Sequence, residues 1–221
     1  MPTDPRPSLL LTRTRDDSLR FAARFPDWPV VVAPILRIVP VAHDGARLEE
    51  APGLVFTSAH AVGAAGPGRR RLAICVGGRT AEAACAAGFT VRQGNGFAQS
   101  LLPMIAEAQV PLIHPHGLHL AQRLPVPGMV VYAQEAQPLD DRARALLEAP
   151  GPVILPVFSP RSARLVAQEV TEARAPLWLV AISAAARAAW HRPAAREAIA
   201  TTPSACSMAE AVRAIAAEEQ S

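Results

Sequence analysis

The sequence predicts an α/β protein of two similar flavodoxin-like lobes with parallel sheets, joined by a two-stranded antiparallel linker. Three observations support this prediction. Short apolar strand patterns alternate with helical patterns, several segments recur about 100 residues later, and two extended proline-containing segments interrupt the alternation. A period of about 100 residues is too long for a solenoid repeat and suits a duplicated domain, so we expect a ligand cleft between the two lobes.

The alternation follows the chain from the N-terminus. Each apolar run of strand length precedes a stretch whose small and apolar residues recur at helical spacing. These pairs are Leu9–Thr12 and Asp17–Phe25, Leu54–Thr57 and Ala59–Ala65, Ala73–Val76 and Thr80–Ala87, Pro111–His114 and Leu118–Leu124, Val153–Phe158 and Ser162–Ala173, and Leu177–Ile182 and Ala184–Trp190. An Ala-rich amphipathic helix is expected at Met208–Glu219. Short apolar strands that alternate with helices indicate parallel sheets covered on both faces.

The repeat consists of matched segments that run from a strand pattern into small residues. They are Val55–Val62 with Val157–Arg164, Leu9–Thr14 with Leu112–Gly117, and Ala73–Ala81 with Leu179–Ala186.

Two segments depart from the alternation. Val30–Val41 and Val130–Pro138 are extended and contain proline, and we expect no helix after Val30–Val41. Proline inside a strand pattern favours an edge strand or a two-stranded ribbon. We therefore predict a linker of residues 34–39 and 131–137, one lobe of residues 1–33 plus 138–221, and a second lobe of residues 40–130.

Composition excludes several functions. The chain has 221 residues and contains no lysine, which excludes a Walker-type phosphate lysine, a Schiff-base lysine and a Ser-Lys dyad. A net charge of +3 and a single tyrosine do not resemble the basic, aromatic surface of a nucleic-acid binder. The triplet Arg69-Arg70-Arg71 is interpreted as a solvated loop. No nucleic-acid partner is expected.

The cysteines and the hydropathy pattern predict a cytoplasmic protein. Cys75, Cys85 and Cys206 form no C-x-x-C pair, which favours reduced thiols. No apolar run reaches about 18 residues, so no membrane span is expected, and Met1–Pro5 begins no export signal. The chain has no heptad pattern, which favours a monomer.

The residues resemble the uroporphyrinogen-III synthase family over nearly the whole chain. The resemblance rests on the order and spacing of short motifs rather than on any one of them. These motifs are Leu10–Arg13, Pro34–Pro40, Phe56–Ser58, Val76–Ala81, Gly88-Phe89, Gly117, Val131-Tyr132 and Phe158–Ala163. The family's fold, two α/β lobes joined by a two-stranded ladder, agrees with the arrangement predicted above.

The resemblance implies an enzyme of porphyrin, tetrapyrrole and heme biosynthesis. It would be a lyase that cyclises hydroxymethylbilane to uroporphyrinogen III, with loss of water and inversion of ring D in the inter-lobe cleft. The family uses no cofactor and no metal, so none is expected. A hand-over of substrate from hydroxymethylbilane synthase would be the one partner interaction.

The implied substrate carries eight carboxylates, which backbone N–H groups at helix N-termini suit because they offer donors at a positive dipole end. The candidate binding residues lie where strands are expected to lead into helices, at the ligand edge of an open α/β sheet. They are Thr57, Ser58, Gly77, Arg79, Thr80, His116, Gly117, Ser159, Arg161, Ser162 and Ser183. The alternative is that the Ser, Thr and Gly residues are only N-caps.

Arg13, directly after the first strand, is a further candidate, either for a bidentate carboxylate contact or for a structural salt bridge. Relatives often have Arg-Gly where this chain has His116-Gly117, and the family commonly has Thr at Ser183. Ser183 is the candidate replacement for that Thr.

Tyr132 is the candidate catalytic residue. Loss of the substrate's hydroxyl group requires a proton donor, and a neutral phenol with a pKa of about 10 can serve as one without carrying charge. The family's equivalent tyrosine is proposed for this role. The alternative is a half-buried ribbon tyrosine, with the reaction driven by binding geometry alone.

Two other functions remain open from the sequence. A two-lobed binding protein for an anionic small molecule, without chemistry, fits the duplicated lobes equally well. The spacing of His114, His116 and His119 raises a metal hydrolase as a distant third, but Pro115 lies between the first two and no acidic cluster follows at ligand spacing.

Overall fold

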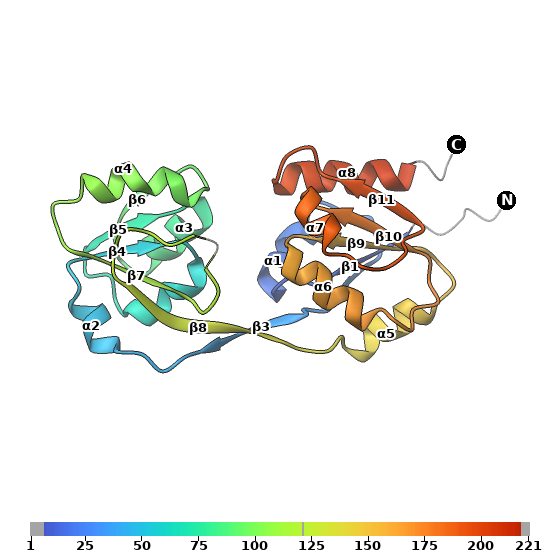
Figure 1. The fold of residues 1–221 in the computed structure, drawn as a ribbon, viewed down its shortest axis with the longest axis horizontal. Coiled ribbons are helices and arrows are strands. Elements are labelled where there is room, and N and C mark those ends of the chain that lie inside the picture. Colours follow the sequence, from blue (N-terminus) through green and yellow to red (C-terminus); the bar gives the residue numbers. More distant parts are fainter. Residues whose placement is uncertain (1–6, 121, 218–221) are drawn as a thin grey trace. The chain divides into compact units, whose positions relative to one another are not determined.

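The computed structural model describes residues 7–120 and 122–217 of the chain (Figure 1). Contacts divide the chain into two units, which we call the discontinuous unit (Met1–Arg37 and Ala136–Ser221) and the central unit (Ile38–Glu135). Residues 1–5, where no export signal was expected, and residues 218–219 of the predicted last helix lie outside the described residues.

The discontinuous unit is built on a five-stranded sheet of order β11-β10-β9-β1-β2. The strands are β1 (Ser8–Leu11), β2 (Val30–Val32), β9 (Val153–Val157), β10 (Leu177–Ala181) and β11 (Arg196–Ile199). All neighbouring strands pair in parallel. Numbered within the unit, the order is 2-1-3-4-5, which is the flavodoxin-like order.

Helices cover both faces of this sheet. They are α1 (Arg15–Ala22), α5 (Asp141–Glu148), α6 (Pro160–Glu169), α7 (Ala184–Ala188) and α8 (Ala205–Ala217). One cluster packs Leu10 and Leu155 against the α5–α7 side through residues such as Val166. The other packs Leu9 and Leu11 against Phe21 of α1, with Val212 of α8 in the same cluster. Burial on both faces explains why the strand sequences are continuously apolar.

The central unit contains most of a six-stranded sheet of order β3-β8-β7-β4-β5-β6. The strands are β3 (Leu36–Pro40), β4 (Gly53–Phe56), β5 (Leu72–Cys75), β6 (Thr90–Gln93), β7 (Leu112–Gly117) and β8 (Gly128–Ala136). Apart from β3, neighbouring strands pair in parallel. The helices are α2 (Gly45–Glu50), α3 (Gly78–Ala86) and α4 (Leu101–Ala106).

The five parallel strands of this sheet have the same spatial order as the other sheet. β6-β5-β4-β7-β8 corresponds to β11-β10-β9-β1-β2. The matched sequence segments lie on corresponding strands of the two sheets, β4 with β9, β7 with β1, and β5 with β10. The parallel sheets of an α/β fold are thus as predicted.

The segment Val30–Val41 is not one ribbon. Val30–Val32 forms β2 in the sheet of the discontinuous unit, and Leu36–Pro40 forms β3 beside β8. The backbone N–H of Val41 donates to Val131 O, and that of Gln137 donates to Ile35 O, both at 3.0 Å. Paired positions therefore advance along one segment as they retreat along the other, which is the antiparallel pattern.

The expectation that no helix follows Val30–Val41 was wrong, because α2 follows. It begins after Asp44, whose carboxylate caps the helix by accepting a hydrogen bond from the Arg47 N–H at 3.0 Å. Of its six residues only Leu48 is buried. A six-residue helix with one buried side chain shows no apolar periodicity, so the sequence pattern did not reveal it.

Two predicted helices also differ. Ala59–Ala65 forms two 3₁₀ turns, η1 (Ala59–Ala61) and η2 (Gly63–Ala65), separated by Val62. The described residues of the predicted helix Leu118–Leu124 are not helical. Leu118 is 58% exposed, so the leucines there do not form one buried face. Besides α2, five further elements were not predicted: β6, η3 (Ala98–Ser100), α4, α5 and β11.

The interpretation of Arg69-Arg70-Arg71 as a solvated loop was wrong for Arg71. Its guanidinium donates hydrogen bonds of 2.7–3.2 Å to the carbonyls of Leu48, Ala51, Ala65, Pro67 and Gly68. Burial, with the nearby charge of Arg69, lowers the pKa of Arg71. Arg71 therefore joins the α2 and η2 segments to the start of β5.

Within the described residues, the helices are too short or too polar to cross a membrane.

Candidate functional site

In each sheet, one pair of neighbouring strands marks the point where the strand order reverses. In the discontinuous unit these strands are β1 and β9, and in the central unit they are β7 and β4. Ligands of open α/β sheets bind beyond the carboxyl ends of the strands at such a point. The candidates Arg13, Ser159 and Ser162 follow β1 and β9, and Thr57 and Ser58 follow β4.

Tyr132 lines a cavity at the reversal point of the central unit. The cavity has a volume of about 280 Å³, and Thr57, Ser58 and Gly117 also line it. The tyrosine is 8% exposed and its ring meets that of His60 edge-on, with centroids 5.9 Å apart. No described residue hydrogen-bonds the phenol, so its O–H can donate to a ligand in the cavity.

Gly117 is required for this position of the tyrosine. It ends β7 beside a register shift in the pairing with β8, where Gly117 pairs with Tyr132. A Cβ atom at Gly117 would lie 2.7 Å from two ring carbons of Tyr132 and 2.9 Å from its hydroxyl oxygen. The missing side chain therefore allows the phenol to lie flat against the strand.

His114 supports the cavity from β7, a role that the sequence reasoning missed. Its Nε2 lies 2.9 Å from Oγ1 of Thr57, and the histidine is 2% exposed. Burial, followed by the neighbouring His116, lowers the pKa of His114 to about 4. The ring is therefore neutral at pH 7. The sequence signal is the alternation of His114 and His116 along an apolar strand, which raised a metal site for the pair and a carboxylate contact for His116 but no supporting role for His114.

The expectation that His116 and Gly117 lie at a strand-to-helix turn was wrong. Both residues belong to β7, and no helix follows in the described residues. The Nδ1–H of His116 donates to Gly117 O at 2.8 Å. The rings of His114 and His116 have centroids 4.9 Å apart. Throughout the described chain, no three His, Cys, Asp or Glu side chains form a group that could hold a metal ion.

The turn after β5 lies at the N-terminus of α3. Gly77 is the N-cap in an extended conformation, and Gly78 begins the helix. Thr80 is buried in the first turn, and Arg79 precedes it. This turn follows the strand next to β4, so it lies at the same edge of the sheet as the Tyr132 cavity.

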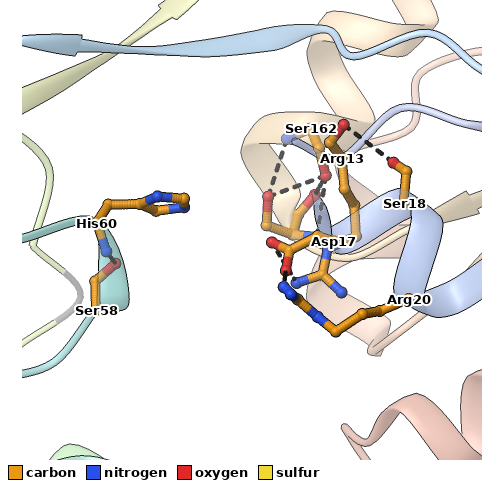
Figure 2. A network of polar contacts seen from close by, with 8 residues as sticks. Arg13, Asp17, Ser18, Arg20, Ser58, His60 and Ser162 are labelled. Atoms are coloured by element: carbon orange, nitrogen blue, oxygen red, sulfur yellow. Dashed lines mark hydrogen bonds and ion pairs between the residues drawn. The ribbon is translucent and has the colours of Figure 1, made fainter. Parts of the chain in front are cut away.

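In the discontinuous unit, Arg13 has the structural salt bridge that was one of its two predicted roles (Figure 2). Its guanidinium donates to Oδ2 of Asp17 at 3.2 Å, and Arg20 donates to the other oxygen of the same carboxylate. The Arg13 guanidinium also lies 4.4 Å from the centroid of the Phe158 ring. The ring and the carboxylate together hold a partly exposed guanidinium beside the carboxyl end of β1.

Ser159 and Ser162 form a capping box at the N-terminus of α6. Ser159 Oγ accepts from the Ser162 N–H at 3.0 Å, and Ser162 Oγ accepts from the Ser159 N–H at 3.1 Å. Arg161 lies between them in the first turn of the helix.

Two further candidates are N-caps. Ser183 caps α7 by accepting from Ala186 N–H at 3.3 Å, and Ser58 caps η1 by accepting from His60 N–H at 3.3 Å (Figure 2). A single cap satisfies one of the four free N–H groups of a helix start. Capping and anion binding are therefore compatible at these turns.

The cysteines are free thiols. Cys75 is buried at the end of β5, and burial raises the pKa of its thiol to about 12. It therefore stays protonated and is no nucleophile at neutral pH.

Comparison with known proteins gives one family. A family model described as uroporphyrinogen-III synthase HemD matches residues 24–210. No curated protein sequence matches.

Solved structures also match. Uroporphyrinogen-III synthetase from Helicobacter pylori 26695 is 14% identical, with a TM-score of 0.65 over 95% of this chain and 99% of that chain. A mutant uroporphyrinogen III synthase from the extremely thermophilic bacterium Thermus thermophilus is 14% identical, with a TM-score of 0.47 over 96% of this chain and 99% of that chain. The Helicobacter match shows the α/β fold.

Proposed function

Because the chain belongs to the uroporphyrinogen-III synthase family, we propose that it cyclises hydroxymethylbilane to uroporphyrinogen III. The reaction removes water and inverts ring D before the macrocycle closes. It breaks one C–O bond and one C–C bond to ring D and forms two C–C bonds, without net oxidation, so we propose that the enzyme needs no redox cofactor. We propose no metal either, as the resemblance to the family implies.

Tyr132 is the proposed proton donor of the first step. The C–O bond of the hydroxymethyl group breaks as the pyrrole nitrogen supplies an electron pair, and the phenol proton leaves with the hydroxyl as water. The substituted α-carbon of the terminal ring then attacks the azafulvene and forms a C–C bond in a spiro intermediate. The bond from that α-carbon to its original bridge carbon breaks and leaves a second azafulvene. The free α-carbon of the same ring attacks this azafulvene and loses its proton, so ring D is inverted as the macrocycle closes. Placement of the phenol in the cavity with Thr57 and Ser58 supports this role.

The carboxylates of the substrate are proposed to bind at helix N-termini and arginines of each unit. In the central unit, the start of α3 offers the backbone of Gly77 and Gly78 with Arg79 and Thr80. In the discontinuous unit, the starts of α6 and α7 offer comparable donors at Ser159, Arg161, Ser162 and Ser183, next to Arg13. Each helix start combines N–H donors with a positive dipole end.

The observation that carries the assignment of Tyr132 is its contact with Gly117, which aims the only phenol of the chain into the cavity. The test supplies the protein with hydroxymethylbilane formed in situ, oxidises the products and separates the type I and type III isomers. Without an enzyme the linear substrate closes to type I. A shift to type III is the expected result, and only type I from folded protein would reject the proposal.

Tyr132→Phe tests the role of the phenol. The variant keeps the ring that packs on Gly117 and removes only the hydroxyl, so it should fold as the parent does. We expect kcat for type III formation to fall at least about tenfold, with a smaller change in KM, because general acid catalysis contributes about 10²–10⁴-fold. Unchanged kcat would show that binding geometry alone drives the reaction.

A further inference from the structure

The two sheets differ at one corresponding connection. In the discontinuous unit, α1 connects β1 to β2, and its Phe21 is in one core cluster with Leu9 and Leu11. In the central unit, residues 118–127 connect the corresponding strands β7 and β8, and none of the described residues of this segment is helical.

A cavity of about 830 Å³ lies at this connection. His114 and His116 of β7 and Gly128 and Val130 of β8 line it on the sheet side. His114 lies on the strand position that corresponds to Leu11, and His116 on the one that corresponds to Arg13, by the sequence match of Leu9–Thr14 with Leu112–Gly117. Where Leu11 packs in an apolar cluster with Phe21, β7 thus has the buried His114, and the half-buried His116 also lines the cavity.

The charge of the lining is one-sided. Its titratable side chains, among the described residues, are His114, His116, His119 and Arg123, and none is acidic. His114 is engaged with Thr57. The Nδ1–H of His116 donates to Gly117 O. His119 and Arg123 therefore remain as donors for a ligand, and an arginine with an imidazole can donate hydrogen bonds to carboxylates.

This cavity adjoins the Tyr132 cavity, because His119, Leu120 and Gln122 line both. A ligand that places a reacting group near Tyr132 can therefore extend another part of itself along β7. Gly128 leaves room for the imidazole of His116 beside this path, since a Cβ atom there would lie 2.7 Å from Nε2 of His116.

We propose that the cavity lined by His116, His119 and Arg123 binds a carboxylate-bearing arm of the substrate whose reacting group lies at Tyr132. This inference rests on the proposed function for the identity of the substrate. The cavity binds the acidic side chains of a pyrrole that does not react, so it contributes to substrate binding and not to the chemical step.

The test compares Arg123→Gln with Arg47→Gln in the full chain. Arg123 is exposed, so its replacement should leave the fold intact, and Arg47 is an exposed arginine of α2 in the same unit that does not line the cavity. We expect Arg123→Gln to raise KM for hydroxymethylbilane about tenfold, the effect of losing one charged hydrogen bond, with kcat within about twofold. Arg47→Gln should match the parent, and an Arg123→Gln KM equal to that of Arg47→Gln would overturn the inference.

Gly128→Ala is a second variant that acts through His116. The added methyl group displaces the imidazole from its place over β8, so KM should rise again while kcat holds. A fall in kcat without a rise in KM would contradict a role in binding alone.

A binding measurement separates this inference from the proposed function. The parent, Arg123→Gln and Arg47→Gln are titrated with uroporphyrin, a stable octacarboxylate whose binding requires no turnover. Weaker binding by Arg123→Gln alone supports the cavity even if the parent forms no type III product. Equal binding by all three proteins, together with unchanged KM in an active enzyme, rejects the cavity and leaves the proposed function in place.

Discussion

The pKa of His114 is set mainly by its burial in the folded protein. His114 is almost fully buried in β7, and its Nε2 contacts the hydroxyl of Thr57, which directly follows the neighbouring strand β4. Protonation in the folded state would bury a charge beside His116, which is why the pKa of His114 falls to about 4. In the unfolded chain the same imidazole titrates near pH 6.5.

This difference predicts a pH dependence of stability. Between pH 6.5 and 4 the unfolded state binds a proton at His114 and the folded state does not, so the free energy of unfolding falls as the pH is lowered through this range. The loss is on the order of 2 kcal/mol, and it is absent above pH 6.5. Urea unfolding of the parent and of His114→Gln at pH 4.5 and pH 7.5 measures it, and the variant should show a smaller pH difference.

Thr57→Val is the matched control for this experiment. It removes the hydroxyl partner and keeps His114 buried, so it should retain the pH difference of the parent. A His114→Gln variant with the full pH difference of the parent would show that other groups cause the acid destabilisation.

At the scale of the element, the helix starts combine two roles. The capping box of Ser159 and Ser162 satisfies donors of α6, and the dipole of the same helix end favours anions. A stabilising cap and the proposed carboxylate site would therefore share one turn, and an alanine substitution alone cannot separate them.

Substitution of Ser159 by Asp separates the two roles. Asp is as good an N-cap as Ser, so Ser159→Asp should unfold within about 0.5 kcal/mol of the parent, whereas Ser159→Ala should lose about 1 kcal/mol. The new negative charge should repel a bound carboxylate and raise KM for hydroxymethylbilane more than Ser159→Ala does. Thermal unfolding and steady-state kinetics of both variants check this. Equal KM values for Ser159→Asp and Ser159→Ala would show that the start of α6 is capped by Ser159 but binds no carboxylate of the substrate.

At the scale of the whole molecule, the core is divided. Each of the hydrophobic clusters lies within one unit, two in the discontinuous unit and two in the central unit. The aromatic reporters are divided in the same way. Trp28, Trp178 and Trp190 belong to the discontinuous unit, and the single tyrosine belongs to the central unit.

This division predicts that the two units unfold separately. Arg71 joins several carbonyls of the central unit, so Arg71→Met should destabilise that unit by about 3 kcal/mol through unsatisfied buried acceptors. Far-UV circular dichroism should then show an earlier transition in urea, while tryptophan fluorescence keeps the midpoint of the parent. Arg70→Gln, at an exposed neighbour, is the control and should change neither probe. A shift of the tryptophan midpoint by Arg71→Met would show one cooperative unit.

Sequence patterns predicted the elements that bury most of their residues or show a helical apolar spacing. The apolar runs at Leu9–Thr12, Val153–Phe158 and Leu177–Ile182 are strands buried on both faces, and Ser159 and Ser183 cap the helices that follow them. Elements with little burial, such as α2, left no periodic signal and were missed. The resemblance to the family could also be found from the sequence, because it rests on the order and spacing of short motifs along the chain.

The sequence by itself therefore determined the fold class, the parallel sheets, the starts of α6 and α7 and the family of this protein. Only the tertiary structure decided that Gly117 receives the ring of Tyr132, that His114 contacts Thr57, and that a basic cavity opens along β7 where the other sheet carries α1. The reason is physical. Periodicity and capping act over a few residues along the chain, whereas these contacts join neighbouring strands whose order and register are set by packing of the whole sheet.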